Sequence, residues 1–362
     1  MTSLKEAARR RLEDIMLGKR AAGLLYPPLA AASLAYSAAT RARNSLYDAG
    51  LLTPEKAPCR IVSVGGLTLG GAGKTPLAIH IARRVMANQR TAILSRGYGQ
   101  RAREDVLVVS DGKNLCAPPP HSADEPYMMA KKLAGVPVVT APRRIDGARK
   151  LVESFGTQTI ILDDGFGHRG LHRDVDIVIV DRHALDPSRR TLFPLGYLRE
   201  PPESLERADA VVIMENDDTK AHFREENEET IRKLAGKDLP VFHARGAITG
   251  FMDQDGTIHK SLDGPAVAFC GVAAPERFKA SLERMNIQLA DLIPFQDHHM
   301  FTEEDIALLN QASSKAGAQC LVTTEKDAVR LDGRTQLFDK PLYAAVWELK
   351  LDRDIVETLG LK

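Results

Sequence analysis

A glycine-rich segment at residues 64–76 joins a β-branched run, 61–64, to an apolar helical pattern over 78–86. The segment ends in Lys74 and Thr75, at the start of the predicted helix. A strand that leads through such a loop into a helix is the context of a P-loop. The glycines let backbone N–H groups approach phosphate oxygens, and the helix N-terminus favours their negative charge. The segment therefore predicts a site for nucleotide phosphates.

The residue types of this loop suggest individual roles. Lys74 would reach the β- and γ-phosphates of ATP, and the Thr75 hydroxyl would bind Mg²⁺. The usual first glycine of the motif falls on Thr68, so the alternative is a glycine-rich turn with an incidental Lys-Thr pair. The rest of the predicted phosphate cradle consists of Thr68, Leu69, Gly70, Gly71, Ala72 and Gly73.

Two other classes of nucleotide-binding protein fit the sequence poorly. Deviant P-loop ATPases carry a lysine just before the paired glycines, where this chain has Leu69. GTPases read guanine with an [NT]-K-x-D motif, whereas here Lys326 directly precedes Asp327. The loop therefore favours an ATP-dependent kinase over either class.

From residue 60 onward, short β-branched runs alternate with longer helical patterns. Strands separated by helices indicate βαβ units and a mostly parallel sheet. We therefore expect an α/β fold of the P-loop NTPase type, with helices flanking the sheet and a second, smaller α/β lobe. The predicted strands are 61–64, 91–94, 136–140, 159–162, 175–180, 210–214, 241–246, 266–270, 319–323 and 343–347.

Turn residues and a charged run indicate how the chain is divided. Asp111-Gly112 follows the run 106–110 and predicts a hairpin at the sheet edge. The charged run 215–229 ends the first half, so the lobe boundary falls within 216–260. The predicted parts are an N-terminal membrane-associated helical segment (1–50), a P-loop kinase lobe (51–240), and a β linker with a smaller C-terminal α/β lobe (241–362).

Acidic residues end two of the predicted strands. Asp163 and Asp164 follow the run 159–162, and Asp181 follows the run 175–180. A Walker-B-type metal site needs an acid at such a strand end, although acids there also form turns and helix caps. Spacing alone does not choose between the two positions.

Two further polar motifs have competing interpretations. Asp124 precedes a helical stretch, and its residue type favours a helix cap there. Asp297 is followed by His298 and His299, but adjacent side chains point apart and no further His or Cys cluster supports a metal. A histidine that orients or tunes a carboxylate base is at least as consistent with the sequence.

The basic charge of the chain is confined to its N-terminal 43 residues. These carry eight Lys/Arg and three acids, which gives +5 and leaves −4 for the remainder of a chain with net charge +1. A net charge this small argues against a nucleic-acid binder that relies on overall basicity. No obligate protein partner is evident either.

Apolar residues recur at helical spacing over 4–20, among several arginines, and the apolar stretch 24–39 follows. This stretch is too short and weakly hydrophobic for a transmembrane span, and Pro27-Pro28 interrupts it. The segment therefore predicts either an interfacial helix on anionic headgroups or a helix packed on its own domain. A signal peptide is disfavoured because the leading region is long and contains acids.

The four cysteines are scattered and include no C-x-x-C pair. A disulfide framework or a zinc site would need closer or patterned thiols. The cysteines therefore predict a reduced, cytosolic protein.

Taken together, the motifs resemble the tetraacyldisaccharide 4′-kinase family, whose members phosphorylate the lipid A precursor. The resemblance runs in order along nearly the whole chain. In the P-loop, Thr68 is similar to the family pattern. The matching segments are 64–76, Ser95-Arg96-Gly97-Tyr98-Gly99, Asp124-Glu125-Pro126, Asp163-Asp164-Gly165-Phe166-Gly167-His168, Leu198-Arg199-Glu200-Pro201, Phe269-Cys270-Gly271, Asp297-His298-His299 and 323–327, with Leu25-Tyr26-Pro27 and 46–50 near the N-terminus.

The resemblance implies transfer of the γ-phosphate of ATP, with Mg²⁺, to the 4′-hydroxyl of a tetraacylated glucosamine disaccharide 1-phosphate in lipopolysaccharide biosynthesis. It also implies peripheral or monotopic association with the cytoplasmic face of the bacterial inner membrane. From the residues alone, two alternatives stay open: another small-molecule P-loop kinase, and a nucleotide-switched binding module at the membrane. A kinase turns over only with its acceptor, whereas a switch hydrolyses nucleotide alone or with a protein partner.

The resemblance also implies roles for individual residues. Asp124 becomes the general base for the 4′-hydroxyl, with His298 as its partner. Asp163 and Asp164 serve the metal and the active-site network. The family usually has glutamine where this chain has Gly167, so any role of that side chain is absent here or supplied from elsewhere. The remaining implied residues are His168 near the acids, Arg199 on phosphate charge and Glu200 at the metal.

Overall fold

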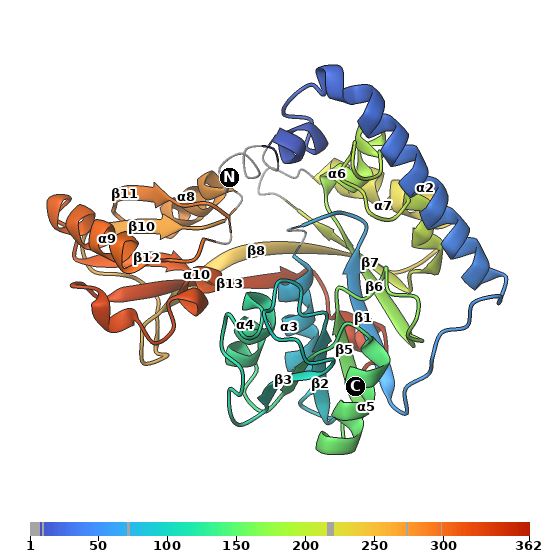
Figure 1. The fold of residues 1–362 in the computed structure, drawn as a ribbon, viewed down its shortest axis with the longest axis horizontal. Helices are drawn as coiled ribbons and strands as arrows, with labels where there is room; N and C mark the ends of the chain where they lie inside the picture. Colours follow the sequence, from blue (N-terminus) through green and yellow to red (C-terminus); the bar gives the residue numbers. More distant parts are fainter. Residues whose placement is uncertain (1–7, 9–10, 71–72, 216–220, 273, 298) are drawn as a thin grey trace.

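The structure is a computed structural model that describes residues 8, 11–70, 73–215, 221–272, 274–297 and 299–362 of the chain. Figure 1 shows two lobes joined by a pair of long strands, β8 and β13. The described strands are β1 (Arg60–Gly66), β2 (Thr91–Ser95), β3 (Leu107–Asp111), β4 (Pro137–Thr140), β5 (Thr159–Asp163), β6 (Val175–Val180), β7 (Ala210–Met214), β8 (Val241–Met252), β9 (Ile258–His259), β10 (Ala266–Cys270), β11 (Leu289–Pro294), β12 (Cys320–Thr324) and β13 (Leu342–Leu351).

These strands form one 13-stranded sheet in the order β11-β10-β12-β13-β8-β7-β6-β1-β5-β2-β4-β3, with β9 paired to β8. Helices cover both of its faces. The helices are α2 (Tyr26–Asp48), α3 (Lys74–Val85), α4 (Asp124–Lys132), α5 (Arg144–Phe155), α6 (Arg182–Leu185), α7 (Ala221–Ala235), α8 (Pro275–Arg284), α9 (Glu303–Lys315), α10 (Glu325–Arg330) and α11 (Ile355–Thr358), with short 3-10 turns that include η3 (Pro202–Arg207).

Strand β1 lies inside the N-terminal lobe, parallel to β5 on one side and to β6 on the other. Val64 pairs in register with Asp163, and Gly66 pairs with Ile179. Because the carboxyl ends of parallel strands meet at one edge of a sheet, this register brings the loop after β1 next to the acids that end β5.

The alternation of side chains along β1 assigns its two faces to different helices. Val62 packs in one buried cluster with Leu77 and Ile81 of α3. Ile61 packs in another cluster with Ile145 of α5. The P-loop helix is therefore fixed to the sheet by apolar burial on the face opposite α5.

Strands β8 and β13 pair antiparallel and connect the two lobes. Because β8 is parallel to β7 and β13 is parallel to β12, the strands of the C-terminal lobe run opposite to those of the N-terminal lobe. A Cβ atom at Gly246 would lie 1.5 Å from the ring of Trp347. The linker therefore needs glycine at position 246 to admit the indole.

The structure confirms the predicted fold class and most predicted strands, and 175–180, 210–214 and 266–270 match β6, β7 and β10 to the residue. The run 106–110 forms edge strand β3, antiparallel to β4, and Gly112 takes a positive φ of 91° in the turn that follows. The sequence patterns missed β11. Most of this edge strand is exposed or half-exposed, so no alternation marks it.

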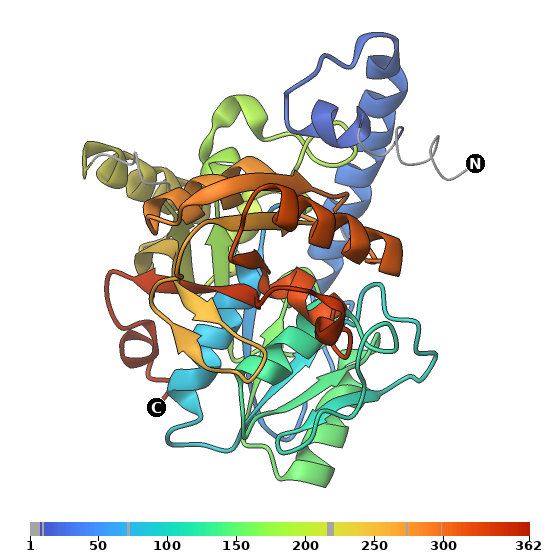
Figure 2. The same ribbon diagram turned by 90° about the vertical axis from the view of Figure 1, so that its left-hand side faces the viewer.

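Helix α2 differs from its prediction. Pro27 and Pro28 do not interrupt the apolar stretch but occupy the first turn of this 23-residue helix, where proline costs no hydrogen bond. Figures 1 and 2 show α2 as a long helix on the outside of the N-terminal lobe. Of the predicted helix 4–20, residues 8 and 11–16 are helical, and 1–7 and 9–10 lie outside the described residues. Among described helices, none is long and apolar enough to cross a membrane.

Candidate active site

The loop after β1 has the backbone of a phosphate-binding turn. Gly70 and Gly73 take positive φ angles of 77° and 87°, and α3 begins at Lys74, directly after Gly73. Leu69 donates its N–H to the Tyr197 carbonyl at 2.9 Å, which ties the loop to the segment before Arg199. Gly71 and Ala72 lie outside the described residues.

Lys74 points back over this loop. Its Nζ donates to the Gly70 carbonyl at 3.3 Å and lies 3.7 Å from Oδ1 of Asp164. Burial lowers the pKa of Lys74, and the field of Asp164 opposes that effect. The ammonium is thus held at a helix N-terminus, where ATP phosphates could replace the Asp164 contact.

Asp163 is a buried carboxylate that is only weakly satisfied. Ser95 lies 3.5 Å from its Oδ2, and Oδ1 has no hydrogen-bond partner in the described part of the chain. Burial raises the pKa of Asp163 to about 7, with the adjacent Asp164 charge as the next cause. A buried oxygen of this kind fits a cation, because a cation would favour the ionised form.

Arg199 shifts the pKa of Asp164 in the opposite direction to that of Asp163. Asp164 adopts a positive φ of 56°, and Arg199 grips both carboxylate oxygens, with Nη1 2.7 Å from Oδ2. Burial disfavours the charged form, but the Arg199 hydrogen bonds outweigh it and lower the pKa of Asp164 to about 2. Arg199 also donates Nε to the Gly66 carbonyl at 3.1 Å. The pKa values of two neighbouring acids at one strand end are therefore shifted in opposite directions.

Glu200, which the resemblance implies at the metal, contacts α2 and the segment after Arg199 in this structure. It is buried, and Arg43 and Asn44 of α2 donate to its two oxygens at 2.6 and 3.1 Å. Ser204 and Arg207 donate to Oε2 at 3.2 and 3.3 Å. In these contacts Glu200 ties α2 to the segment that carries Arg199. Within the described residues, no group of three His, Cys, Asp or Glu side chains could hold a metal.

A group of arginines surrounds His168, and sequence reasoning did not assemble it. Burial lowers the pKa of His168 to about 4, and the fields of Arg144, Arg173, Arg96 and Arg43 act in the same direction. The imidazole is therefore neutral near pH 7. These arginines come from separate elements, so only their shared charge could have suggested a cluster.

Asp124 is not the helix cap that its position in the sequence favours. It is the first residue of α4, the N-cap is Ala123, and no side chain caps this end. Its Oδ2 instead accepts a hydrogen bond from Nε of Arg330 in the C-terminal lobe, at 2.8 Å. His298, its predicted partner, lies outside the described residues. Nearby His299 bonds Asp305 at 2.8 Å, at the start of α9.

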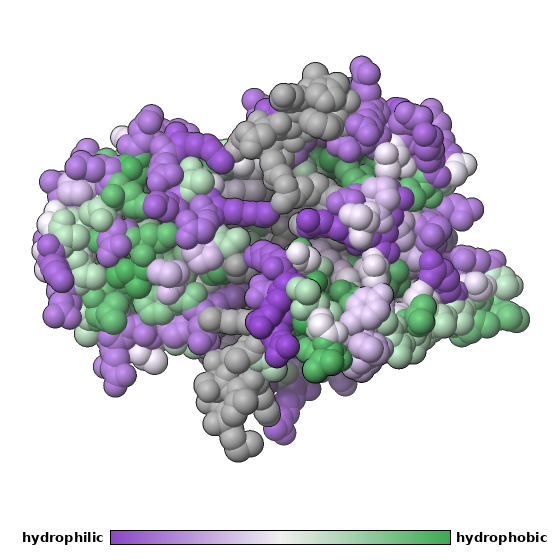
Figure 3. All heavy atoms as spheres, turned by 90° about the horizontal axis from the view of Figure 1, so that it is seen from above, coloured by the Kyte–Doolittle hydropathy of each residue, from purple (hydrophilic) through white to green (hydrophobic). Residues whose placement is uncertain are grey.

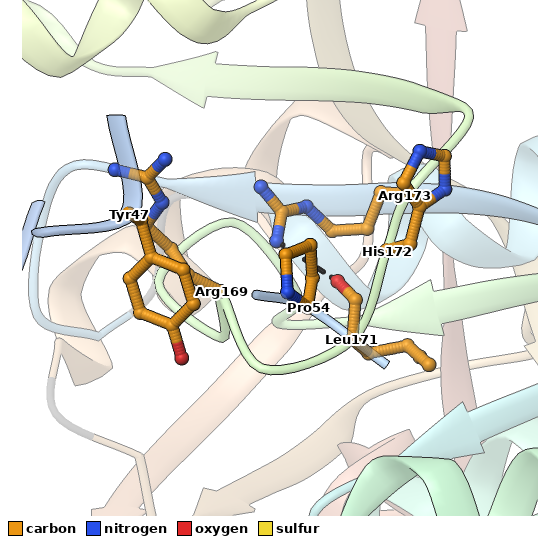
Figure 4. A pocket seen from close by; sticks show the side chains of 6 residues that line it. All are labelled: Tyr47, Pro54, Arg169, Leu171, His172 and Arg173. Atoms are coloured by element: carbon orange, nitrogen blue, oxygen red, sulfur yellow. Dashed lines mark hydrogen bonds between the residues drawn. The ribbon is translucent and has the colours of Figure 1, made fainter. Parts of the chain in front are cut away.

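A cavity of about 160 Å³ opens where α2 meets the segment after His168. Figure 4 shows the Tyr47 ring beside Arg169, whose guanidinium lies 4.9 Å from the ring centre and pairs with Asp48 at 2.7 Å. The cavity contains none of the P-loop residues. Its lining residues are Tyr47, Pro54, Arg169, Leu171, His172 and Arg173.

The parallel sheet, the loop with Lys74 and the two acids at the adjacent strand end define a P-loop nucleotide-dependent enzyme. Residues 25–361 match the family model for tetraacyldisaccharide-1-P 4'-kinase, and the chain belongs to this family. Its activity is ATP-dependent phosphorylation of the 4′-hydroxyl of the lipid disaccharide in lipid A biosynthesis.

Individual relatives agree with this assignment. The chain is 40% identical over 311 residues to a tetraacyldisaccharide 4'-kinase of Anaeromyxobacter dehalogenans, which covers 84% of this chain and 81% of the relative. It is 37% identical over 342 residues to the enzyme of Desulfatibacillum aliphaticivorans, covering 90% and 89%. The "apo" form of LpxK from Aquifex aeolicus, in complex with ATP, aligns with a TM-score of 0.74 and 30% identity over 93% of this chain and 98% of that chain.

Proposed function

We propose that this kinase transfers the γ-phosphate of ATP with Lys74 and Arg199 organising the charge, Asp163 at the metal and Asp124 as the general base. The observation that carries the proposal is the β1–β5 register, which places Asp163 beside the strand that leads into the P-loop. Attack of an alcohol on a phosphate needs alignment, charge neutralisation and acceptance of one proton. The described residues offer a group for each task.

On the nucleotide side, the backbone of Thr68 to Gly73 would cradle the phosphates, and the Lys74 ammonium would neutralise the β- and γ-oxygens. Thr75, in the first turn of α3, and Asp163 would hold Mg²⁺ through oxygen atoms, as this ion prefers. When bound, Mg²⁺ supplies neutralisation of charge on the phosphate oxygens. Arg199 keeps Asp164 ionised next to Lys74, which preserves the balance of charge before ATP arrives.

On the acceptor side, Asp124 would accept the proton of the 4′-hydroxyl, with His298 as its partner. Neutral His168, among Arg96 and Arg144, would lie beside the substrate without adding positive charge. Glu200 would act through Arg43 and Asn44 to hold the Arg199 segment in place.

The membrane is proposed as the surface on which the enzyme meets its lipid substrate, at the cytoplasmic face of the inner membrane. Helix α2 buries polar residues, Ser33, Thr40 and Asn44, against the lobe. Its outward side carries alanines and leucines, including Leu34, which is 72% exposed. Figure 3 shows hydrophobic residues at the right-hand edge, where α2 ends. Leu51, three residues after the end of α2, is 74% exposed. Exposed apolar residues along one side of a helix are typical of an interfacial helix.

An assay of ATP and the monophosphorylated lipid disaccharide in detergent tests the proposal, with Mg²⁺ varied. Transfer should need the acceptor and should fall sharply when Mg²⁺ is chelated. Tight ATP binding without transfer at any Mg²⁺ concentration would contradict it. Nucleotide hydrolysis without acceptor would favour the switch-like binding module instead.

A further inference from the structure

Helix α10 of the C-terminal lobe packs against α4 of the N-terminal lobe through a row of charged contacts. At the start of α4, Asp124 contacts Arg330, and the neighbouring Glu125 contacts Lys326. At the other end of α4, Lys132 lies 2.7 Å from Oε1 of Glu325. Two acids in the first turn of one helix therefore meet two cations spaced one turn apart on the other.

Arg330 differs from the other members of this row in its burial and in its second partner. Its side chain is 1% exposed. Nη1 bonds Oδ1 of Asp327 at 2.7 Å and the Gly271 carbonyl at 3.3 Å, while Nε bonds Asp124 at 2.8 Å. A planar guanidinium held at two points has little rotational freedom left at the third.

Asp327 is in turn fixed by its own neighbours. It is fully buried and accepts hydrogen bonds from the Gly271 N–H at 3.0 Å and from the Thr324 hydroxyl at 2.6 Å. These hydrogen bonds fix the segment from Thr324 to Arg330 on the C-terminal lobe. The Arg330 contact to Asp124 joins residues 206 positions apart in the chain.

We propose that Arg330 is a positioning residue for catalysis: it holds the Asp124 carboxylate ionised and in one orientation from the opposite lobe. This rests on the proposed role of Asp124 as the general base. A charge-assisted hydrogen bond favours the ionised form, and a carboxylate fixed in direction meets the acceptor hydroxyl without a search over rotamers. The C-terminal lobe thereby contributes to proton transfer through a residue that touches neither substrate.

The interface provides a matched control. Lys132 pairs with Glu325 and also donates to the Trp347 carbonyl at 3.0 Å, so it joins the same two helices without contact to Asp124. If Arg330 only held the lobes together, loss of Lys132 would have a similar effect. Lys132→Met should lower the melting temperature and leave kcat unchanged.

Removal of Arg330 alone would leave Asp327 buried without its cation, which risks misfolding. The test variant is therefore Arg330→Met with Asp327→Asn, in the full-length enzyme with ATP and the lipid disaccharide. We expect kcat to fall about 10²-fold, with KM for ATP within about twofold of the native value. Arg330→Lys, which keeps a positive charge but lacks the planar guanidinium, should retain more kcat than this double variant.

The same double change in an Asp124→Asn background separates the inference from the proposed base. If Arg330 acts through Asp124, the change should cost little further kcat there. An inactive Asp124→Asn enzyme in which the change still costs the full factor would overturn the inference and leave the base in place. Unchanged kcat after Arg330→Met with Asp327→Asn in the native background would also overturn the inference and leave the base in place. A fully active Asp124→Asn enzyme would overturn both.

Discussion

Helices α2 and α3 both lie against the N-terminal lobe, but they bury opposite kinds of side chain. Helix α3 buries Leu77 and Ile81 in the core beneath the P-loop. Helix α2 buries Ser33, Thr40 and Asn44, and its leucines and alanines face outward.

The difference shows that the two helices are held by different forces. Removal of apolar surface from water fixes α3 and with it the P-loop. Hydrogen bonds hold α2: Ser33 donates to the Leu192 carbonyl at 2.6 Å, and Tyr36 donates to the Arg199 carbonyl at 2.9 Å. The protein core covers the apolar side of α3, whereas apolar residues of α2 such as Leu34 stay exposed, as the proposed membrane contact requires.

The largest effect should come from the first residue of α3. Lys74→Met should lower kcat on the order of 10²–10³-fold, because a positioned cation at the phosphates is lost. Stability should change little, since burial already lowers the pKa of Lys74 and Met is uncharged. Steady-state kinetics and thermal unfolding measure the two quantities. Lys233→Met, at an exposed pair on α7, is the control, and an equal kcat loss there would contradict the assignment.

Identical leucine truncations then compare the two helices directly. Leu77→Ala in α3 should lower the free energy of unfolding by about 2–5 kcal/mol, because it leaves a cavity in the core. Denaturant unfolding measures this value. Binding of the folded variant to anionic vesicles should be unchanged. A stability loss below about 1 kcal/mol would show that α3 does not depend on this burial.

Leu34→Ala in α2 should give the reverse result. The side chain is mostly exposed, so unfolding should change by less than about 0.5 kcal/mol. Partition into anionic vesicles should fall about tenfold, because methylene groups are withdrawn from the acyl boundary. Vesicle sedimentation measures the partition. Unchanged partition, with normal folding, would mean that the outward face of α2 does not enter the membrane.

The smallest effect concerns His168, whose pKa is lowered in part by the field of Arg43 of α2. Its folded-state pKa of about 4 lies below the ordinary 6.5, so between these pH values the unfolded state binds more protons. The stability contribution is therefore complete above pH 6.5 and is lost as the pH falls from 6.5 towards 4. Solvent screening of the partly exposed ring limits it to about 1 kcal/mol. Unfolding curves of His168→Gln should show a shallower loss over this range, and an identical slope would contradict the shift.

Some of the site could be predicted because its signals lie close together in the chain. The loop from Gly70 to Thr75 carries its own backbone chemistry, and the β-branched runs before Gly66 and Asp163 predict strands of a mostly parallel sheet. The proposed choice of Asp163 over Asp181 draws on the structure, because both residues follow similar runs in the sequence. Both β5 and β6 flank β1, and the register opposes Asp163 to Val64, whereas Asp181 accepts the N–H of Ala184 at the start of α6.

The sequence by itself determined the α/β class, the P-loop and the family, because these depend on residue type and periodicity over short windows. Only the tertiary structure decided that Arg330 partners Asp124, that Glu200 faces α2, and that α2 turns its polar side inward. Each of these depends on ion pairs or hydrogen bonds between residues more than 150 positions apart. Such contacts form only when the lobes and helices have packed, since no local pattern records which distant charge will fill a buried site.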